Sequence, residues 1–208
     1  MVSLILIVIL SYFIGSFPTG IVFGRAFRGI DVREYGSKTM GATNVLRVLG
    51  PRLAIPVLAI DILKGVIAVI IISRINLGDL AMSEHWLKII AGFVAIGGHV
   101  FPVWVHFKGG KGIGTAAGVM IALFPLELGF ALLIFALTVA LTRYVSLGSI
   151  LATCFLFCAL LTEKYYLGLP IPEVYMAMVF LLLIIVLLTH RQNIKRLLKG
   201  QENKFGKK

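Results

Sequence analysis

The feature of this sequence that most limits its possible folds is a succession of long apolar segments separated by short polar stretches. Hydrophobic residues make up 59% of the 208 positions and charged residues only 14%, against about 25% charged residues in a soluble domain. About 20 apolar residues are needed for an α-helix to cross a bilayer, and a helix satisfies its own backbone groups there. The sequence therefore predicts an all-α integral membrane protein, with residues 1–208 forming a single domain.

Seven apolar segments are expected to be transmembrane helices. They are Val2–Arg25, Leu53–Ile75, Lys88–Phe107, Gly112–Pro125, Leu128–Thr142, Leu147–Thr162 and Val174–Thr189. The fourth and fifth are short for a span and could be tilted, re-entrant or partly joined. The first run lacks the basic region that precedes a cleaved signal sequence, so we interpret it as a span.

The basic residues indicate how the chain is oriented. With the N-terminus outside, sixteen of the twenty Lys and Arg residues fall on one side of the membrane. These are Arg25, Arg28, Arg33, Lys38, Arg47, Arg52, Lys108, Lys111, Arg143, Arg191, Lys195, Arg196, Lys199, Lys204, Lys207 and Lys208. Lys and Arg concentrate in cytoplasmic loops, so we expect an outside N-terminus and a cytoplasmic C-terminus. The net charge of +11 lies in these loops and does not indicate a nucleic-acid partner.

A glycine-rich turn, Lys108-Gly109-Gly110-Lys111-Gly112, joins the third and fourth segments. Without Cβ atoms, such a backbone can bend sharply and bring several N–H groups to a ligand. Lysines and a helix start beside these groups favour phosphate. The turn matches neither the P-loop nor the dinucleotide-binding pattern, so no nucleotide is expected, and a flexible interhelical turn is the alternative. His99 precedes the turn and could be catalytic or an ordinary hydrogen-bonded helix histidine.

A second polar cluster runs from Gly36 to Arg47 and is rich in small residues and hydroxyls. If the chain is helical from Gly41 onward, Asn44 and Arg47 share one helix face, with Thr43 beside them. An arginine can hold a phosphate through two parallel hydrogen bonds. A capped cytoplasmic loop is the alternative reading of this cluster.

A third cluster contains His190 and Asn193, three residues apart, with Glu202 further on. The stretch from His190 to Lys199 alternates apolar and basic residues and predicts a short amphipathic helix at the membrane surface. A basic tail that binds anionic membrane lipid is the alternative function, although such a tail needs neither the imidazole nor the amide.

Asp61 and Lys64 lie inside the second apolar segment, where charges either pair or serve a function. Cys154 and Cys158 are interpreted as packing residues within a helix. The acids expected on the cytoplasmic side are too few for a metal cage, and no catalytic triad pattern is found. The chemistry that we expect is anion binding and group transfer without a metal or cofactor.

Taken together, the three clusters resemble the motifs of the acyl-phosphate-dependent glycerol-3-phosphate acyltransferase family of bacteria. GSKTMGATNVLR is similar to the first motif, GHVFPVWVHFKGGKGIGTA to the second and HRQNIKRLLKGQE to the third, in the same order along the chain. One departure is visible, because Lys38-Thr39 stands where the family usually has Gly-Asn. Ser37, Thr43, Asn44 and Arg47 match the first motif.

The resemblance implies transfer of a fatty acyl group from acyl phosphate to the 1-hydroxyl of glycerol 3-phosphate at the bacterial cytoplasmic (inner) membrane. The products would be lysophosphatidic acid and inorganic phosphate, with the active site facing the cytoplasm. On this hypothesis Lys108, Lys111 and the backbone of Gly109, Gly110 and Gly112 hold the donor phosphate. The acceptor would be held by Ser37, Arg47, His190 and Asn193. Thr43 and Asn44 are also expected to contact substrate, and Asn44 is a further catalytic candidate.

The proton acceptor is left open by the sequence. His190, His99 and an oxygen of the donor phosphate are the candidates, and we favour the phosphate because no base is clearly paired with an orienting carboxylate. An acylated Ser37 is a less favoured route.

Two functions of other classes also fit parts of the sequence. A membrane transporter of a phosphorylated lipid precursor would explain the helices, but a carrier needs a site near the midplane rather than polar clusters on one side. A scaffold that binds anionic lipid would explain the charge but not Asn44, His99 or Asn193.

Overall fold

The computed structural model describes residues 1–206, and they confirm an all-helical architecture. The chain packs as two compact units, Met1–Leu123 and Phe124–Lys208. The expectation of one domain over residues 1–208 stays a prediction.

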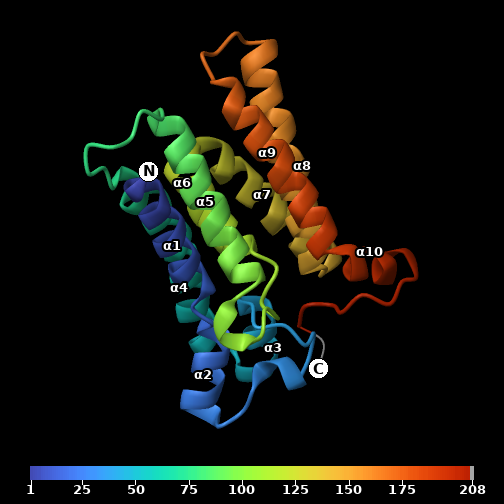
Figure 1. Cartoon of the computed structure of the whole chain (residues 1–208). Coiled ribbons are helices and arrows are strands. Elements are labelled where there is room, and N and C mark those ends of the chain that lie inside the picture. Colours follow the sequence, from blue (N-terminus) through green and yellow to red (C-terminus); the bar gives the residue numbers. More distant parts are fainter. Residues whose placement is uncertain (207–208) are drawn as a thin grey trace. The chain divides into compact units, whose positions relative to one another are not determined.

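The first unit contains six α-helices and three short 3₁₀ turns (Figure 1). The helices are α1 (Val2–Ser16), α2 (Thr19–Arg28), α3 (Ala42–Leu49), α4 (Pro51–Ile70), α5 (Glu84–Val100) and α6 (Ile113–Leu123), and the 3₁₀ turns are Val32–Glu34, Ile72–Arg74 and Val103–Val105. Helix α1 packs along α5, and α4 packs along α6. These pairs form the framework to which the polar loops of the unit are attached.

Proline residues set several of these boundaries. Pro18 interrupts the first apolar run, because a proline cannot donate its backbone nitrogen and disfavours helix at the residue before it. The expectation of one continuous helix over Val2–Arg25 is therefore wrong, since α1 ends at Ser16 and α2 begins at Thr19. Pro51 and Pro125, by contrast, begin helices, where a missing N–H costs nothing.

Small residues allow α4 and α6 to approach closely. A Cβ added at Gly65 would lie 2.1 Å from the carbonyl oxygen of Thr115, and one added at Gly118 would lie 1.9 Å from that of Ile62. Such small-residue contacts are the usual means by which membrane helices bring their backbones together. The start of α6 is thereby held tightly against the middle of α4.

The second unit consists of α7 (Pro125–Thr142), α8 (Val145–Tyr165), α9 (Glu173–Thr189) and α10 (Arg191–Leu198). Helix α8 packs against both α7 and α9. The chain bends by 60° between α9 and α10, as Figure 1 shows. The amphipathic helix expected between His190 and Lys199 is confirmed as α10.

All seven expected apolar segments contain helix, but fewer qualify as spans. Among the described residues, five helical segments are long and apolar enough to cross a membrane, or six if α9 and α10 count as one bent span. Helix α6 has 11 residues, well short of the roughly 20 required. The fourth and fifth segments are separate helices, because α6 ends at Leu123 and α7 begins at Pro125.

Candidate active site

The carboxamide of Asn44 organises the loop before α3. Its nitrogen donates to the backbone carbonyls of Val32 (2.7 Å), Thr39 (2.8 Å) and Tyr35 (3.2 Å). Its oxygen accepts from the backbone N–H of Ser37 at 2.8 Å. Asn44 is completely buried, so its amide positions the loop rather than facing a ligand.

Ser37 lies in this loop with its hydroxyl 3.2 Å from the Asn44 carboxamide oxygen and 3.4 Å from the Thr39 hydroxyl. Neither of these groups is a base that could deprotonate a serine. The next residue, Lys38, has φ of 57°, a left-handed conformation that glycine and asparagine adopt more readily. The loop therefore keeps a sharp turn at Lys38, although this residue is poorly suited to it.

Helix α3 begins at Ala42, directly after Gly41, which confirms the helical register on which the first cluster depends. Arg47 lies one turn after Asn44 on the same face, and Thr43 lies beside it. Arg47 and Thr43 are both partly exposed. The structure thus places a guanidinium on the helix that Asn44 joins to the serine loop.

Arg33 connects this loop to the segment leading into the glycine-rich turn. Its guanidinium forms two hydrogen bonds to Asp31, of 3.1 and 2.8 Å. It also donates to the carbonyls of Val105 (3.4 Å) and Lys108 (3.5 Å). Hydrogen bonds from Arg33 lower the pKa of Asp31 to about 2. Val105 also packs with Val32 in one hydrophobic cluster, so the first two polar clusters are adjacent.

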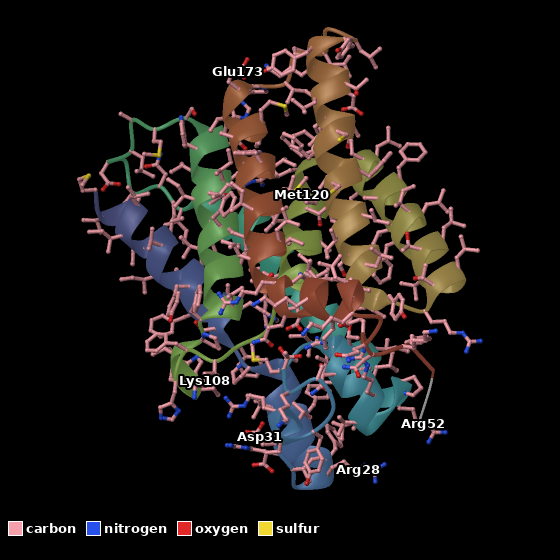
Figure 2. All side chains as sticks on the ribbon, turned by 90° about the vertical axis from the view of Figure 1, so that its right-hand side faces the viewer. Arg28, Asp31, Arg52, Lys108, Met120 and Glu173 are labelled. Carbon is pink, nitrogen blue, oxygen red and sulfur yellow. The ribbon has the colours of Figure 1, made fainter. Side chains whose placement is uncertain are left out.

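Charged side chains gather at the end of the first unit that carries these loops. Figure 2 labels four of them at this end: Arg28, Asp31, Arg52 and Lys108.

The glycine-rich turn folds back on the end of α5. The N–H groups of Gly109 and Gly110 donate to the carbonyls of Val100 (3.2 Å) and His99 (3.1 Å). These two donors are thus used inside the protein, which leaves ligand binding to groups later in the turn and at the start of α6. Gly112 has φ of 80°, a conformation that favours glycine.

His99 lies directly beneath this turn. A Cβ added at Gly110 would lie only 2.2 Å from the imidazole Nε2, so the backbone of the turn rests on the ring. Nδ1 of the same ring lies 3.7 Å from Asp61 Oδ1. Only 3% of the surface of His99 is exposed.

Asp61 is at the centre of a buried polar cluster. Its Oδ1 accepts from Lys64 Nζ at 2.6 Å and from the Thr19 hydroxyl at 3.0 Å. Lys64 Nζ also donates to the carbonyl of Phe17 at 2.6 Å, at the break between α1 and α2. The expected pairing of Asp61 with Lys64 is therefore present, and its hydrogen bonds extend to α2 and to the residue that follows α1.

In the second unit, His190 joins α9 to α10 and is 2% exposed. Its Nδ1 lies 2.9 Å from the carbonyl oxygen of Val186. A carbonyl can only accept, so Nδ1 carries the proton and Nε2 is the unprotonated nitrogen of the neutral ring. His190 thus has the tautomer in which Nε2 can accept a proton.

Glu202 fixes the C-terminal segment to α10 and α8. Its carboxylate accepts from Asn193 (2.7 Å), Arg196 (2.8 Å) and Ser146 (3.1 Å). Asn193 is buried by this arrangement, with 6% of its surface exposed. The third cluster is therefore a preorganised group of side chains around one carboxylate.

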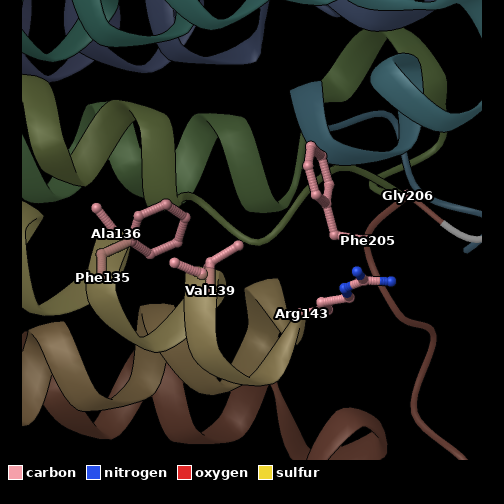
Figure 3. A pocket seen from close by; sticks show the side chains of 7 residues that line it. Phe135, Ala136, Val139, Arg143, Phe205 and Gly206 are labelled. Atoms are coloured by element: carbon pink, nitrogen blue, oxygen red, sulfur yellow. The ribbon is translucent and has the colours of Figure 1, made fainter.

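The second unit also contains an open cavity of about 500 Å³ along α7 (Figure 3). Phe135, Val139 and Phe205 make it mainly apolar, and Arg143 supplies the guanidinium at its edge. None of the expected site residues lines it.

The structure thus brings the first two predicted clusters together in the first unit and builds the third within the second. The sequence did not single out Arg33, which links the first two clusters, or the contact between Asp61 and His99. An Asp-x-Arg spacing at residues 31–33 is the one local signal for the former, and no local signal exists for the latter. Among residues 1–206, no three His, Cys, Asp or Glu side chains form a group that could hold a metal ion.

Comparison with known proteins is consistent over nearly the whole chain. The family model described as glycerol-3-phosphate acyltransferase matches residues 5–200. A glycerol-3-phosphate acyltransferase of Fusobacterium nucleatum is 43% identical, covering 95% of this chain and 96% of its own. That of Chlorobium limicola is 40% identical, covering 100% and 99% of the two chains.

Two solved structures have the same fold. The crystal structure of PlsY, an integral membrane glycerol 3-phosphate acyltransferase, is similar in its glycerol 3-phosphate form with a TM-score of 0.86. Its lysophosphatidic acid form gives 0.84. In both comparisons the identity is 36%, and the match covers 98% of this chain and 96% of the other.

Proposed function

The chain belongs to the PlsY glycerol-3-phosphate acyltransferase family and is an integral membrane enzyme that makes lysophosphatidic acid; from this premise we propose that its donor is an acyl phosphate. An acyl phosphate is an activated mixed anhydride, so its transfer requires neither a metal nor a nucleotide. The observation that carries this proposal is the glycine-rich turn, a basic, sharply bent backbone directly before the start of α6.

The donor phosphate is proposed to bind at the later part of this turn. Because the N–H groups of Gly109 and Gly110 are bonded to α5, we assign the phosphate to Gly112 and the first turn of α6. Helix N-termini and lysine side chains both favour a phosphate group, and Lys108 and Lys111 supply the latter. The same groups would stabilise the negative charge of the departing phosphate.

Glycerol 3-phosphate is proposed to bind at the first cluster. Arg47 offers a planar fork that matches phosphate geometry, and Ser37 offers a hydroxyl held in place by Asn44. His190 and Asn193 match the third motif of the family and are proposed to bind substrate as well. Much of the rate enhancement would then come from holding the acceptor hydroxyl at the acyl carbonyl.

The acyl group is proposed to move directly from donor to acceptor. The 1-hydroxyl oxygen attacks the acyl carbon, the bond from this carbon to the phosphate oxygen breaks, and phosphate leaves with the electron pair. The environment of Ser37 supports this route, because an acyl-serine mechanism needs a base beside the nucleophile and Ser37 contacts an amide and a hydroxyl. Mass spectrometry that trapped an acyl group on Ser37 would contradict direct transfer.

The proton of the 1-hydroxyl is proposed to move to an oxygen of the leaving phosphate, so that no protein group changes its net protonation. His190 is the alternative acceptor through Nε2. His99 remains a further candidate, since it has the nearby carboxylate of Asp61. The pH dependence of kcat is compared for the wild type and for variants of each histidine. An ionisation that is lost only when one of the two histidines is replaced would identify that histidine as the acceptor.

The enzyme is proposed to cross the cytoplasmic membrane seven times, with the N-terminus outside and the active site facing the cytoplasm. The charge bias of the loops supports this orientation. Single cysteines placed at Arg52 and at Leu77, in a background without Cys154 and Cys158, can be labelled with a membrane-impermeant maleimide in intact spheroplasts. Labelling at Leu77 but not at Arg52 is expected, and the reverse pattern would overturn the orientation.

The donor assignment is tested with purified protein given acyl phosphate and labelled glycerol 3-phosphate without any other enzyme. Lysophosphatidic acid and inorganic phosphate are expected in equal amounts. Acyl-CoA and acyl carrier protein thioesters serve as parallel donors. If a thioester supports the reaction and acyl phosphate does not, the donor assignment is wrong.

A further inference from the structure

The buried Asp61–Lys64 pair contacts the elements on both sides of the glycine-rich turn. His99 lies near the end of α5, before the turn. Its Nδ1 is 3.7 Å from Asp61 Oδ1. Gly114 follows the turn in α6, and a Cβ added to it would lie 3.0 Å from Asp61 Cβ. The turn is therefore bracketed by two contacts to a single aspartate of α4.

The pair also contacts a segment far from the turn in sequence, at the break between α1 and α2. Lys64 Nζ donates to the carbonyl of Phe17, and Thr19 donates its hydroxyl to Asp61. Phe17 and Thr19 flank Pro18, which separates α1 from α2. The charged pair thus uses the irregular backbone of the first apolar run as a fixed support, while Lys64 balances the charge of Asp61.

From these contacts of Asp61 on both sides of the turn, and from its support by Thr19 and Lys64, we propose that Asp61 is a positioning residue for the donor site, acting through His99. The carboxylate orients the imidazole by its Nδ1, and the opposite ring nitrogen supports the turn backbone at Gly110. The distance of 3.7 Å exceeds a hydrogen bond, and Nδ1 has no hydrogen-bond partner among the described residues. Catalytic hydrogen bonds are often long without substrate and shorten when it binds, so donor phosphate at the turn is expected to close this contact.

This inference rests on the proposed donor and differs from a purely structural role for the pair. A pair that only joined helices would affect folding and would leave the kinetics of the folded enzyme unchanged for both substrates. A positioning pair affects the use of acyl phosphate and leaves the use of glycerol 3-phosphate nearly unaltered. The comparison of the two KM values separates these roles.

The test compares Asp61→Asn with Glu84→Gln in purified, folded enzyme. Asparagine keeps an oxygen that can accept from Thr19 and Lys64 but removes the charge that attracts the imidazole. We expect the KM for acyl phosphate to rise at least about tenfold, with the KM for glycerol 3-phosphate unchanged within about twofold. Glu84→Gln breaks the exposed Glu84–Lys88 pair of α5 and is expected to change neither value.

Thr19→Val keeps the test decisive if Asp61→Asn does not fold, because it removes only one hydrogen bond to the same oxygen. It is expected to raise the KM for acyl phosphate by about threefold. Nitrogen NMR of labelled histidine gives a readout independent of turnover, with the His99 resonances shifting in the variant and upon addition of acyl phosphate to the wild type.

Unchanged donor kinetics in a folded variant, or equal increases in both KM values, would overturn the inference. Unperturbed His99 resonances in the folded Asp61 variant would do the same. A wild-type enzyme that makes no product from acyl phosphate would instead overturn the donor assignment, before any variant is compared.

Discussion

Two buried side chains of the first unit, Asn44 and Asp61, each hold several polar groups together, but they do so in different ways. The partners of Asn44 all come from one loop, between five and twelve residues away in sequence. Apart from Lys64 on its own helix, those of Asp61 come from other helices, with Thr19 42 residues away. Asn44 is neutral and needs no counterion, whereas Asp61 is charged and needs Lys64.

The difference shows that the two proposed substrate sites are stabilised by different means. The proposed acceptor loop is held by hydrogen bonds to its own backbone, so its shape depends on an amide that both donates and accepts. The proposed donor turn is held by a charged group that connects distant helices. Local loop geometry and long-range helix packing therefore contribute separately to one active site.

The largest effect on stability is expected when the amide of Asn44 is replaced by a carboxylate, and it is compared with the opposite exchange at Asp61. Asn44→Asp removes the donors to three carbonyls and places a charge against them, while protonation restores only one donor. In Asp61→Asn, the new amide oxygen can still accept hydrogen bonds from Lys64 and from the Thr19 hydroxyl. We expect Asn44→Asp to lower the free energy of unfolding by about 3 kcal/mol or more, and Asp61→Asn by distinctly less.

Denaturant unfolding of both variants in one detergent measures this difference. A smaller loss for Asn44→Asp than for Asp61→Asn would remove the distinction between the two centres.

Gly110→Ala tests the proposed donor turn, which depends on Asp61. The new methyl group would lie 2.2 Å from His99 Nε2, so either the ring or the turn must move. We expect the KM for acyl phosphate to rise about tenfold or more, with little change for glycerol 3-phosphate. Equal losses for the two substrates would instead indicate a folding defect, which circular dichroism of the variant can detect.

Arg47→Lys tests the proposed acceptor site, whose loop is held by Asn44. Lysine keeps the charge but lacks the planar fork that binds phosphate through two hydrogen bonds. The KM for glycerol 3-phosphate is expected to rise about tenfold, and the KM for acyl phosphate is expected to stay near the wild-type value. Steady-state kinetics with each substrate varied in turn gives both values, and an unaltered acceptor KM would remove Arg47 from the site.

The Arg33–Asp31 contact, which connects the serine loop to the segment before the glycine-rich turn, is tested by varying the pH. The hydrogen bonds from Arg33 lower the pKa of Asp31 from 3.8 to about 2. Because the folded pKa is the lower one, the stabilisation is fully present above about pH 4 and is lost as the pH falls through about 2. Asp31→Asn should therefore remove part of the acid dependence of the melting temperature. Overlapping wild-type and variant curves from pH 5 to pH 2 would show that this contact contributes nothing.

The smallest effect is expected at Lys38. A left-handed residue other than glycine costs about 1–2 kcal/mol, part of which the greater unfolded-state entropy of glycine offsets. Lys38→Gly should stabilise the protein by about 0.5 kcal/mol, with both KM values unchanged. A lower melting temperature would mean that the lysine side chain makes a favourable contact that outweighs the strain.

Features that depend on neighbouring residues were predictable from the sequence. The apolar runs predicted the helices of both units, and the residues after Gly41 predicted α3 with Asn44 and Arg47 on one face. The break at Pro18 was missed because hydropathy continues across it, although the proline itself was visible. The count of seven crossings stays a prediction, because five or six helical segments among the described residues qualify as spans and α6 has only 11 residues.

Contacts between distant segments were not predictable in the same way. Asn44 was expected to contact substrate, whereas its amide is occupied by the loop backbone. Residue type shows that a side chain can form hydrogen bonds, but only the fold determines with which partner. The same limit applies to Asp61, whose pairing with Lys64 was expected from spacing while its approach to His99 required the packing of α4 against α5.

The shortness of α6 has a consequence for how a lipid substrate is handled. A helix of 11 residues rises about 16 Å, whereas the hydrocarbon core is about 30 Å thick. If α6 completes a crossing, then either the bilayer thins around it or the glycine-rich turn lies below the level of the headgroups. In both cases the phosphate end of the proposed acyl-phosphate donor would reach the turn while most of its acyl chain stays in hydrocarbon. On this proposal the enzyme would avoid the roughly 0.8 kcal/mol per methylene that extraction of that chain into water requires.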